Sequence, residues 1–137
     1  MSNGPGDAPR SDGLPPILGL AYWGDLEDLR TAVWKGASLE VTDELGSTPL
    51  ILAAGQGHAT CVSALLEGGA DVGARTNYGD TALTLAASGG HLDVVRTLLL
   101  GGADPRSTGS LGRTGVAFAR EQGHEDIAEL IEHWPAG

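Results

Sequence analysis

Hydrophobic residues recur along this chain at two periods, a short one typical of helices and a long one of 33 residues. Within 50–66 and again within 83–99, apolar residues fall three or four positions apart, which is the spacing of an amphipathic helix. A Gly-His dipeptide divides each stretch, and a Gly-Gly-Ala-Asp turn closes it. We therefore predict pairs of short helices, each pair followed by an extended loop. Thr48 and Thr81 stand where the first helix of a pair begins, and we predict that they are N-caps.

The long period makes the chain a repeat array. Fifteen residues of 44–72 recur unchanged 33 positions later in 77–105, without a gap. The same frame continues in both directions with fewer matches, as expected of end units that face water on one side. We predict an all-α solenoid over 13–134, because one helix pair cannot bury its apolar face alone. The predicted units are 10–42, 43–75, 76–108 and 109–134, with a disordered polar tail at 1–12 and a short tail at 135–137.

Charge and cysteine content narrow the classes of function. Among 137 residues, 18 Asp and Glu against 8 Lys and Arg give a formal net charge of −10. Nucleic acids and anionic membranes both require a basic surface, so neither is an expected partner. A protein with a basic patch is favoured instead. The single cysteine cannot form an internal disulfide, and we expect a cytoplasmic or nuclear protein.

The two best-matched units resemble the ankyrin repeat family. The segments GSTPLILAAGQGH with VSALLEGGAD, and GDTALTLAASGGH with VRTLLLGGAD, carry this resemblance. It implies a non-catalytic module that binds another protein in a concave groove, without a cofactor. We expect the unbound protein to be a monomer.

The resemblance also bears on the histidines and the cysteine. Gly57, Gly90 and Gly123 are predicted to end the first helix of their units, and each precedes a histidine. In the family, the ring of this histidine bonds across the turn between helices and to the neighbouring unit. Cys61 occupies a position filled by Val or Ile in later units, so we interpret it as a small buried hydrophobe.

Partner-binding positions are implied by the same resemblance, from the loop tips and the exposed side of each first helix. Tyr22, Trp23 and Tyr78 are aromatic anchors of the kind found in interface hot spots. Tyr22 and Trp23 have an alternative role in covering the open end of the stack, and Trp34 and Trp134 are predicted to pack as caps. The full predicted set is Tyr22, Trp23, Glu44, Leu45, Gln56, Asn77, Tyr78, Asp80, Leu111 and Arg113.

Three alternative functions remain at this point. An inhibitor of cyclin-dependent kinases is one, because 112–131 is similar to the last unit of such inhibitors. Their second unit has a shortened first helix, whereas 50–58 is complete here. A metal protein or enzyme built on His58, His91 and Cys61 is the second, and a purely structural scaffold is the third.

Overall fold

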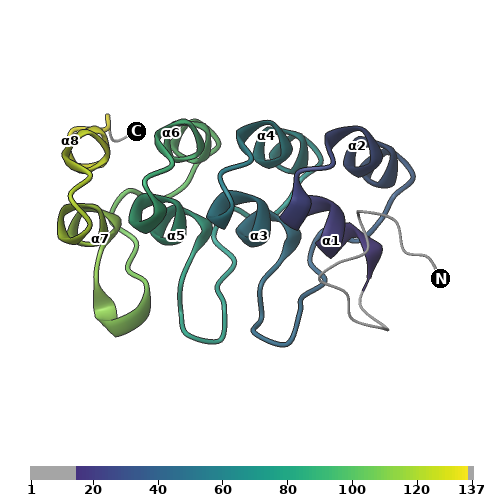
Figure 1. The fold of residues 1–137 in the computed structure, drawn as a ribbon, viewed down its shortest axis with the longest axis horizontal. Coiled ribbons are helices and arrows are strands. Elements are labelled where there is room, and N and C mark those ends of the chain that lie inside the picture. Colours follow the sequence, from purple (N-terminus) through teal and green to yellow (C-terminus); the bar gives the residue numbers. More distant parts are fainter. Residues whose placement is uncertain (1–14, 136–137) are drawn as a thin grey trace.

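The computed structural model describes residues 15–135, and its helices form two stacked layers (Figure 1). The described part of the chain contains eight α-helices and one short 3-10 helix, η2 (Ser110–Gly112), so the predicted all-α solenoid is confirmed. The first layer consists of α1 (Pro16–Trp23), α3 (Pro49–Gly55), α5 (Ala82–Gly89) and α7 (Gly115–Glu121). The second layer consists of α2 (Leu26–Trp34), α4 (Ala59–Glu67), α6 (Leu92–Leu100) and α8 (Glu125–Glu132). The predicted tail at 1–12 lies outside the described residues.

Threonines begin three of the four first-layer helices. The hydroxyl oxygen of Thr48 accepts the backbone N–H of Ile51 at 3.2 Å, which confirms the predicted N-cap of α3. Thr81 caps α5 in the same way, by accepting the backbone N–H of Thr84. In turn, the hydroxyl oxygen of Thr84 accepts the backbone N–H of Thr81 at 2.9 Å. Thr114 caps α7 through the backbone N–H of Ala117. These bonds satisfy N–H groups that the first turn of a helix leaves without an intrahelical partner.

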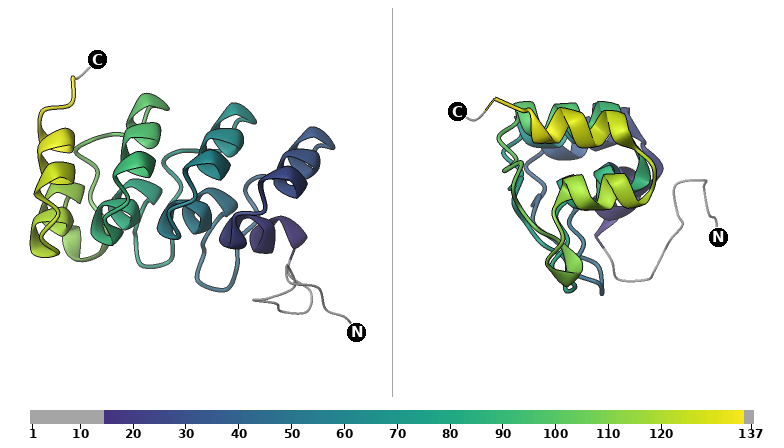
Figure 2. Two further views of the ribbon diagram at one scale, coloured as in Figure 1. Left: turned by 45° about the horizontal axis from the view of Figure 1, so that its top comes forward. Right: turned by 90° about the vertical axis from the view of Figure 1, so that its left-hand side faces the viewer.

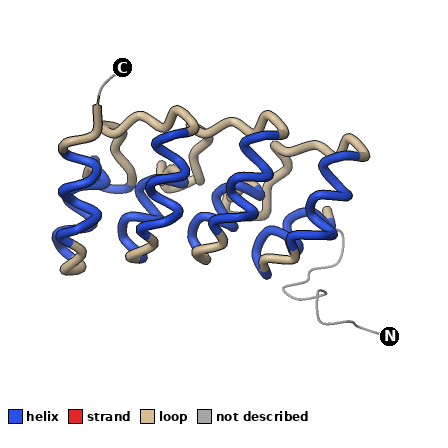
Figure 3. Tube along the Cα trace, turned by 90° about the horizontal axis from the view of Figure 1, so that it is seen from above, coloured by secondary structure: helices blue, strands red, loops and turns tan. Residues whose placement is uncertain are grey.

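Left-handed glycines allow the chain to reverse between the two helices of a unit. Gly90 is the C-cap of α5, with φ of 78°. Gly57 and Gly123 have φ of 82° and 83° but lie one residue beyond the C-caps Gln56 and Gln122. All three glycines therefore act at the predicted turn, and only Gly90 is itself the cap. Short turns lie along one edge of the stack and long loops along the other (Figure 3).

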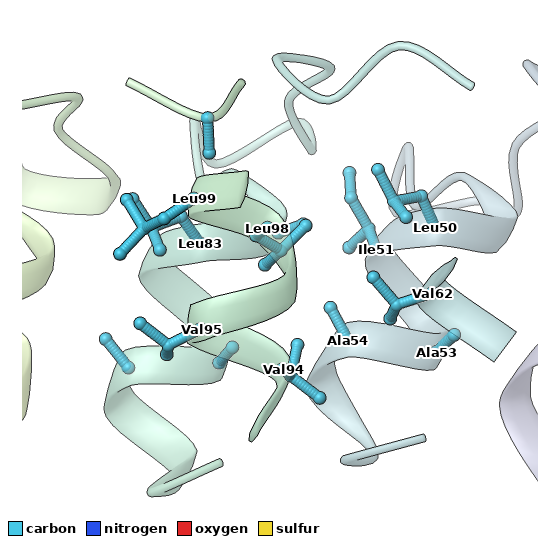
Figure 4. Packing of buried hydrophobic residues seen from close by; sticks show 14 of the residues in the cluster. Leu50, Ile51, Ala53, Ala54, Val62, Leu83, Val94, Val95, Leu98 and Leu99 are labelled. Carbon is cyan, nitrogen blue, oxygen red and sulfur yellow. The ribbon is translucent and has the colours of Figure 1, made fainter. Parts of the chain in front are cut away.

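The core runs continuously through the stack and is built from small and branched residues (Figure 4). Ala54 and Ala87 are completely buried on first-layer helices, which lets those helices pack closely. The second-layer helices contribute Val62 and Leu98, both with no exposed surface. Each unit thus completes the core of its neighbours, as the repeat pattern predicted.

Histidines link the second and third units to the units that precede them. The His58 ring donates from Nε2 to the carbonyl oxygen of Tyr22 at 2.9 Å, and His91 donates in the same way to Gly55 at 3.1 Å. Each ring fits over a glycine of the preceding unit: a Cβ on Gly24 would lie 2.7 Å from the His58 ring. The bond to the neighbouring unit agrees with the prediction, whereas neither ring bonds across its own turn among the described contacts.

The two ends of the stack differ in polarity. At the C-terminal end, Arg120 pairs with Glu132 at 2.8 Å and with Glu125 at 3.4 Å. At the N-terminal end, an apolar hollow of about 200 Å³ is open to solvent. The residues that line it are Pro15, Pro16, Ile17, Leu20, Ala32, Ala37, Ser38 and Val41. Tyr22 and Trp23 are not among the residues that line it.

The two remaining tryptophans differ from each other. Trp134 is partly buried and packs against the core, as predicted. The prediction for Trp34 was wrong, since this side chain is 86% exposed. Trp34 is the last residue of α2. The side of this helix that faces the core carries Leu29, whereas Trp34 faces solvent.

Candidate protein-binding surface

Three long loops project beyond the first-layer helices, on the side away from the second layer (Figure 2). Their tips carry large apolar residues at matching positions of successive units: Leu45, Tyr78 and Leu111. These side chains are 50%, 68% and 85% exposed, in that order. We call these three residues the tip row. All three belong to the predicted binding set.

Hydrogen bonds between neighbouring loops hold the tip row in place. The backbone N–H of Asn77 donates to the Leu45 carbonyl at 2.9 Å, and its side-chain amide donates to the Glu44 carbonyl at 3.1 Å. Further along, a carboxylate oxygen of Asp80 accepts the backbone N–H of Ser110 at 2.7 Å. Asn77 and Asp80 were predicted to bind a partner; here their side chains fasten one loop to the next.

Arg75 also links the loops, and sequence reasoning missed it. Its guanidinium donates to the Gly79 carbonyl of its own loop at 2.7 Å and to the Thr108 carbonyl of the next loop. Isolated β-bridges join Arg75 to Thr81 and Thr108 to Thr114 at the bases of these two loops. The only sequence signal was an arginine that replaces the threonine of neighbouring units.

The third loop differs from the other two in its backbone. Leu111 has φ of 61° and ψ of 17°, a left-handed conformation that is unfavourable for leucine. It is the only non-glycine residue with positive φ in the described part of the chain. Next to it, Arg113 pairs with Glu121 of α7 at 2.6 Å, with both side chains partly exposed. Such an exposed pair contributes little to stability.

The free side of each first-layer helix forms the second part of the surface. Gln56 is exposed at the end of α3, as its place in the predicted set requires. Positions three and four residues apart share one helical face, so Leu52 lies on the face of Gly55 and Gln56. Leu85 and Phe118 occupy the same position in the next two units, and all three are only partly buried. We call Leu52, Leu85 and Phe118 the helix row. The prediction omitted them, although their 33-residue spacing was visible.

An aromatic pair lies at the N-terminal end of the surface. The rings of Tyr22 and Trp23 meet edge to face, with centroids 5.0 Å apart and planes at 81°. About half of Trp23 is exposed, while Tyr22 is partly buried and its carbonyl receives the His58 bond. Trp23 therefore offers a large, rigid apolar face to solvent.

Charges are sparse on the first-layer helices. α1, α3 and α5 contain no charged residue. At the first loop tip, Glu44 is exposed, and no cation lies within ion-pair distance of it among residues 15–135. Asp43 beside it accepts the backbone N–H groups of Leu45 and Ser47, each at 2.9 Å. The first tip is therefore acidic.

Cys61 lies in an environment that lowers the reactivity of its thiol. Cys61 is fully buried, and burial raises the pKa of its thiol, with the nearby Asp25 carboxylate as a second cause. A thiol that resists ionisation is a poor nucleophile and metal ligand. Within the described residues, no group of three or more His, Cys, Asp or Glu side chains is placed to hold a metal ion.

The alternative of a kinase inhibitor depended on the first helix of the second unit. That helix, α3, has seven residues, the same number as α7. It is one residue shorter than α1 and α5, so the second unit has a first helix of nearly the same length as those of the other units.

Comparison with known protein families agrees with this architecture. A family model described as ankyrin repeats (three copies) matches residues 18–109. Ankyrin repeats generally mediate protein–protein interactions and are typically non-enzymatic. Over residues 15–135, no helix combines the length and apolar character that a membrane crossing requires. The matched residues, the 33-residue repeat and the two-layer stack together show that this chain belongs to the ankyrin repeat family.

Proposed function

We propose that this protein is an adaptor or stoichiometric inhibitor that binds one partner protein along the tip row, the helix row and the Tyr22–Trp23 pair. The observation that carries the proposal is the tip row: three mostly exposed apolar side chains at the same position of successive units. Exposed apolar residues gathered on one face mark interaction sites. Since neighbouring loops are bonded to each other, little conformational entropy is lost when a partner binds.

The predicted polar residues have different parts in this proposal. Glu44, Gln56 and Arg113 are exposed and accessible to a partner. Asn77 and Asp80 position the loops through the bonds described above, and their direct contact with a partner remains a prediction. With the net charge of −10, a partner with a basic patch is favoured. We also propose a cytoplasmic or nuclear protein that is monomeric when unbound, which analytical sizing over a range of concentrations tests.

Partner capture from a lysate of the source cells tests the binding surface. The bait proteins are the wild type, a Trp23→Ala, Tyr78→Ala variant, and a matched Trp34→Ala, Leu100→Ala control. The control also loses two exposed apolar side chains, but from second-layer helices. We expect a partner that the wild type and the control retain and the first variant loses. Circular dichroism first establishes that all three are folded. Equal retention by all three would place binding on another surface.

A further inference from the structure

We propose that the partner segment bound here is a polyproline II helix with an apolar side chain at every third residue and a basic residue at one end. The proposal rests on the proposed function, because it names the chemistry of the segment that occupies that surface. Three features of the surface support it: the spacing of the tip row, the exposed ring of Tyr78 within that row, and the charge at the first tip.

The tip row has nearly the same repeat distance as a polyproline II helix. Leu45, Tyr78 and Leu111 occupy the same position in successive units, and the first-layer helices of those units pack side by side (Figure 1). Packed helices lie about 8–10 Å apart, so apolar tips recur at about that interval. A polyproline II helix repeats every three residues with a rise of about 3.1 Å each, or about 9.3 Å per turn. Side chains on one face of a β-strand recur at about 6.6 Å, which does not match.

The helix row repeats at the same interval. Leu52, Leu85 and Phe118 are each the fourth residue of the helix that follows a tip residue, and each is partly exposed. A segment that runs along the stack therefore passes one tip residue and one helix-row residue in each unit. No charged side chain from α3 or α5 competes for this space.

The exposed ring of Tyr78 favours polyproline II over an α-helix. A partner helix with one apolar residue per seven would also repeat at about 10.5 Å, so spacing alone does not separate the two. However, exposed Tyr and Trp rings are the surfaces on which polyproline II segments dock, because their flat faces fit the prolines. Tyr78, the middle residue of the tip row, is an exposed ring of this kind.

Charge indicates which end of the surface the basic residue of the segment occupies. Glu44 and Asp43 make the first tip acidic, whereas Arg113 at the third tip is paired with Glu121. A basic residue in the partner is therefore attracted to the end of the surface near Leu45. This complementarity matches the overall charge of −10 and steers association.

Two synthetic peptides of identical composition test the proposal. The first, RLPPLPPLPP, places leucine at every third position after an arginine; the second, RLLLPPPPPP, clusters the leucines. Isothermal titration calorimetry with the full-length protein measures the dissociation constant of each. We expect the first peptide to bind at least about tenfold more tightly, because clustered leucines reach only one unit. The Leu45→Ser, Tyr78→Ser, Leu111→Asn variant is expected to lose this preference, while the Trp34→Ala, Leu100→Ala control keeps it.

Several results would overturn the proposal. These are equal affinity for the two peptides, no binding of the first peptide, or tighter binding of a helical peptide with leucine at every seventh position. The lysate experiment separates this failure from failure of the proposed function. If the Trp23→Ala, Tyr78→Ala variant loses a captured protein yet neither peptide binds, the surface is an interface for a partner of different structure. If capture is also unaffected, the surface is not an interface.

Discussion

Substitution of Gly57 by alanine tests the contact that joins the second and third units. Gly57 has φ of 82°, and a Cβ there would lie 2.8 Å from Nδ1 of the His91 ring. The ring cannot move away without losing its bond to the Gly55 carbonyl. Gly69 provides a matched control, since it has φ of 98° but its Cβ would meet no neighbouring atom within 4 Å.

The expected magnitudes follow from these two environments. At Gly69, alanine suffers only the left-handed backbone cost of about 1–2 kcal/mol. At Gly57, the same cost is joined by loss of the His91 hydrogen bond, about 1 kcal/mol, and by overpacking of about 1 kcal/mol or more. We therefore expect Gly57→Ala to lower the free energy of unfolding by about 3–4 kcal/mol, roughly 2 kcal/mol more than Gly69→Ala.

A double-mutant cycle with urea denaturation measures this difference. In a His91→Ala background the clash is gone, so Gly57→Ala is expected to cost about as much as Gly69→Ala. The coupling between Gly57 and His91 should then be about 2 kcal/mol. If Gly57→Ala costs the same with and without the imidazole, the ring does not hold the two units together as described.

Three further predictions concern single groups. Because burial raises the pKa of the Cys61 thiol above its ordinary 9.0, the folded protein holds that proton more tightly than the unfolded chain. The free energy of unfolding should therefore be constant with pH below 9.0 and decrease above it. Urea denaturation between about pH 8 and about pH 10 should show a smaller decrease for Cys61→Ala than for the wild type. Leu111→Gly should raise the free energy of unfolding by up to about 1 kcal/mol, because relief of the left-handed leucine outweighs the greater flexibility of glycine in the unfolded chain; an unchanged or lower melting temperature would contradict this. A hydrogen bond from Arg120, and then its charge, lower the pKa of Glu132 below 4.5; an NMR titration should find that Arg120→Gln returns it toward 4.5.

Most of the fold was accessible from the sequence because the repeat supplies the same information several times. The caps Thr48 and Thr81, the turn glycines and the buried Cys61 all occupy positions that neighbouring units explain. Trp34 was misjudged because its helical position alone does not reveal that no neighbouring element reaches it. The 86% exposure depends on where the following loop goes, which is a tertiary property.

The candidate surface was only partly predictable for a related reason. Exposed tips such as Tyr78 follow directly from the repeat frame. The side chains of Asn77, Asp80 and Arg75 reach across to another loop, and those contacts require three-dimensional distances. The helix row was overlooked because a leucine inside a short helix is ordinarily assigned to the core.

The hydrogen bonds between loops and those from the histidines all join immediately neighbouring units. The number of units can therefore change without disturbing the contacts within the stack. A further copy of 76–108 inserted after residue 108 would contact the same kind of helix faces on both of its sides. It would also bring one more apolar tip and one more helix-row side chain. Recognition could thus be extended or shortened in whole steps, each adding or removing one contact point for the partner, without redesigning any interior.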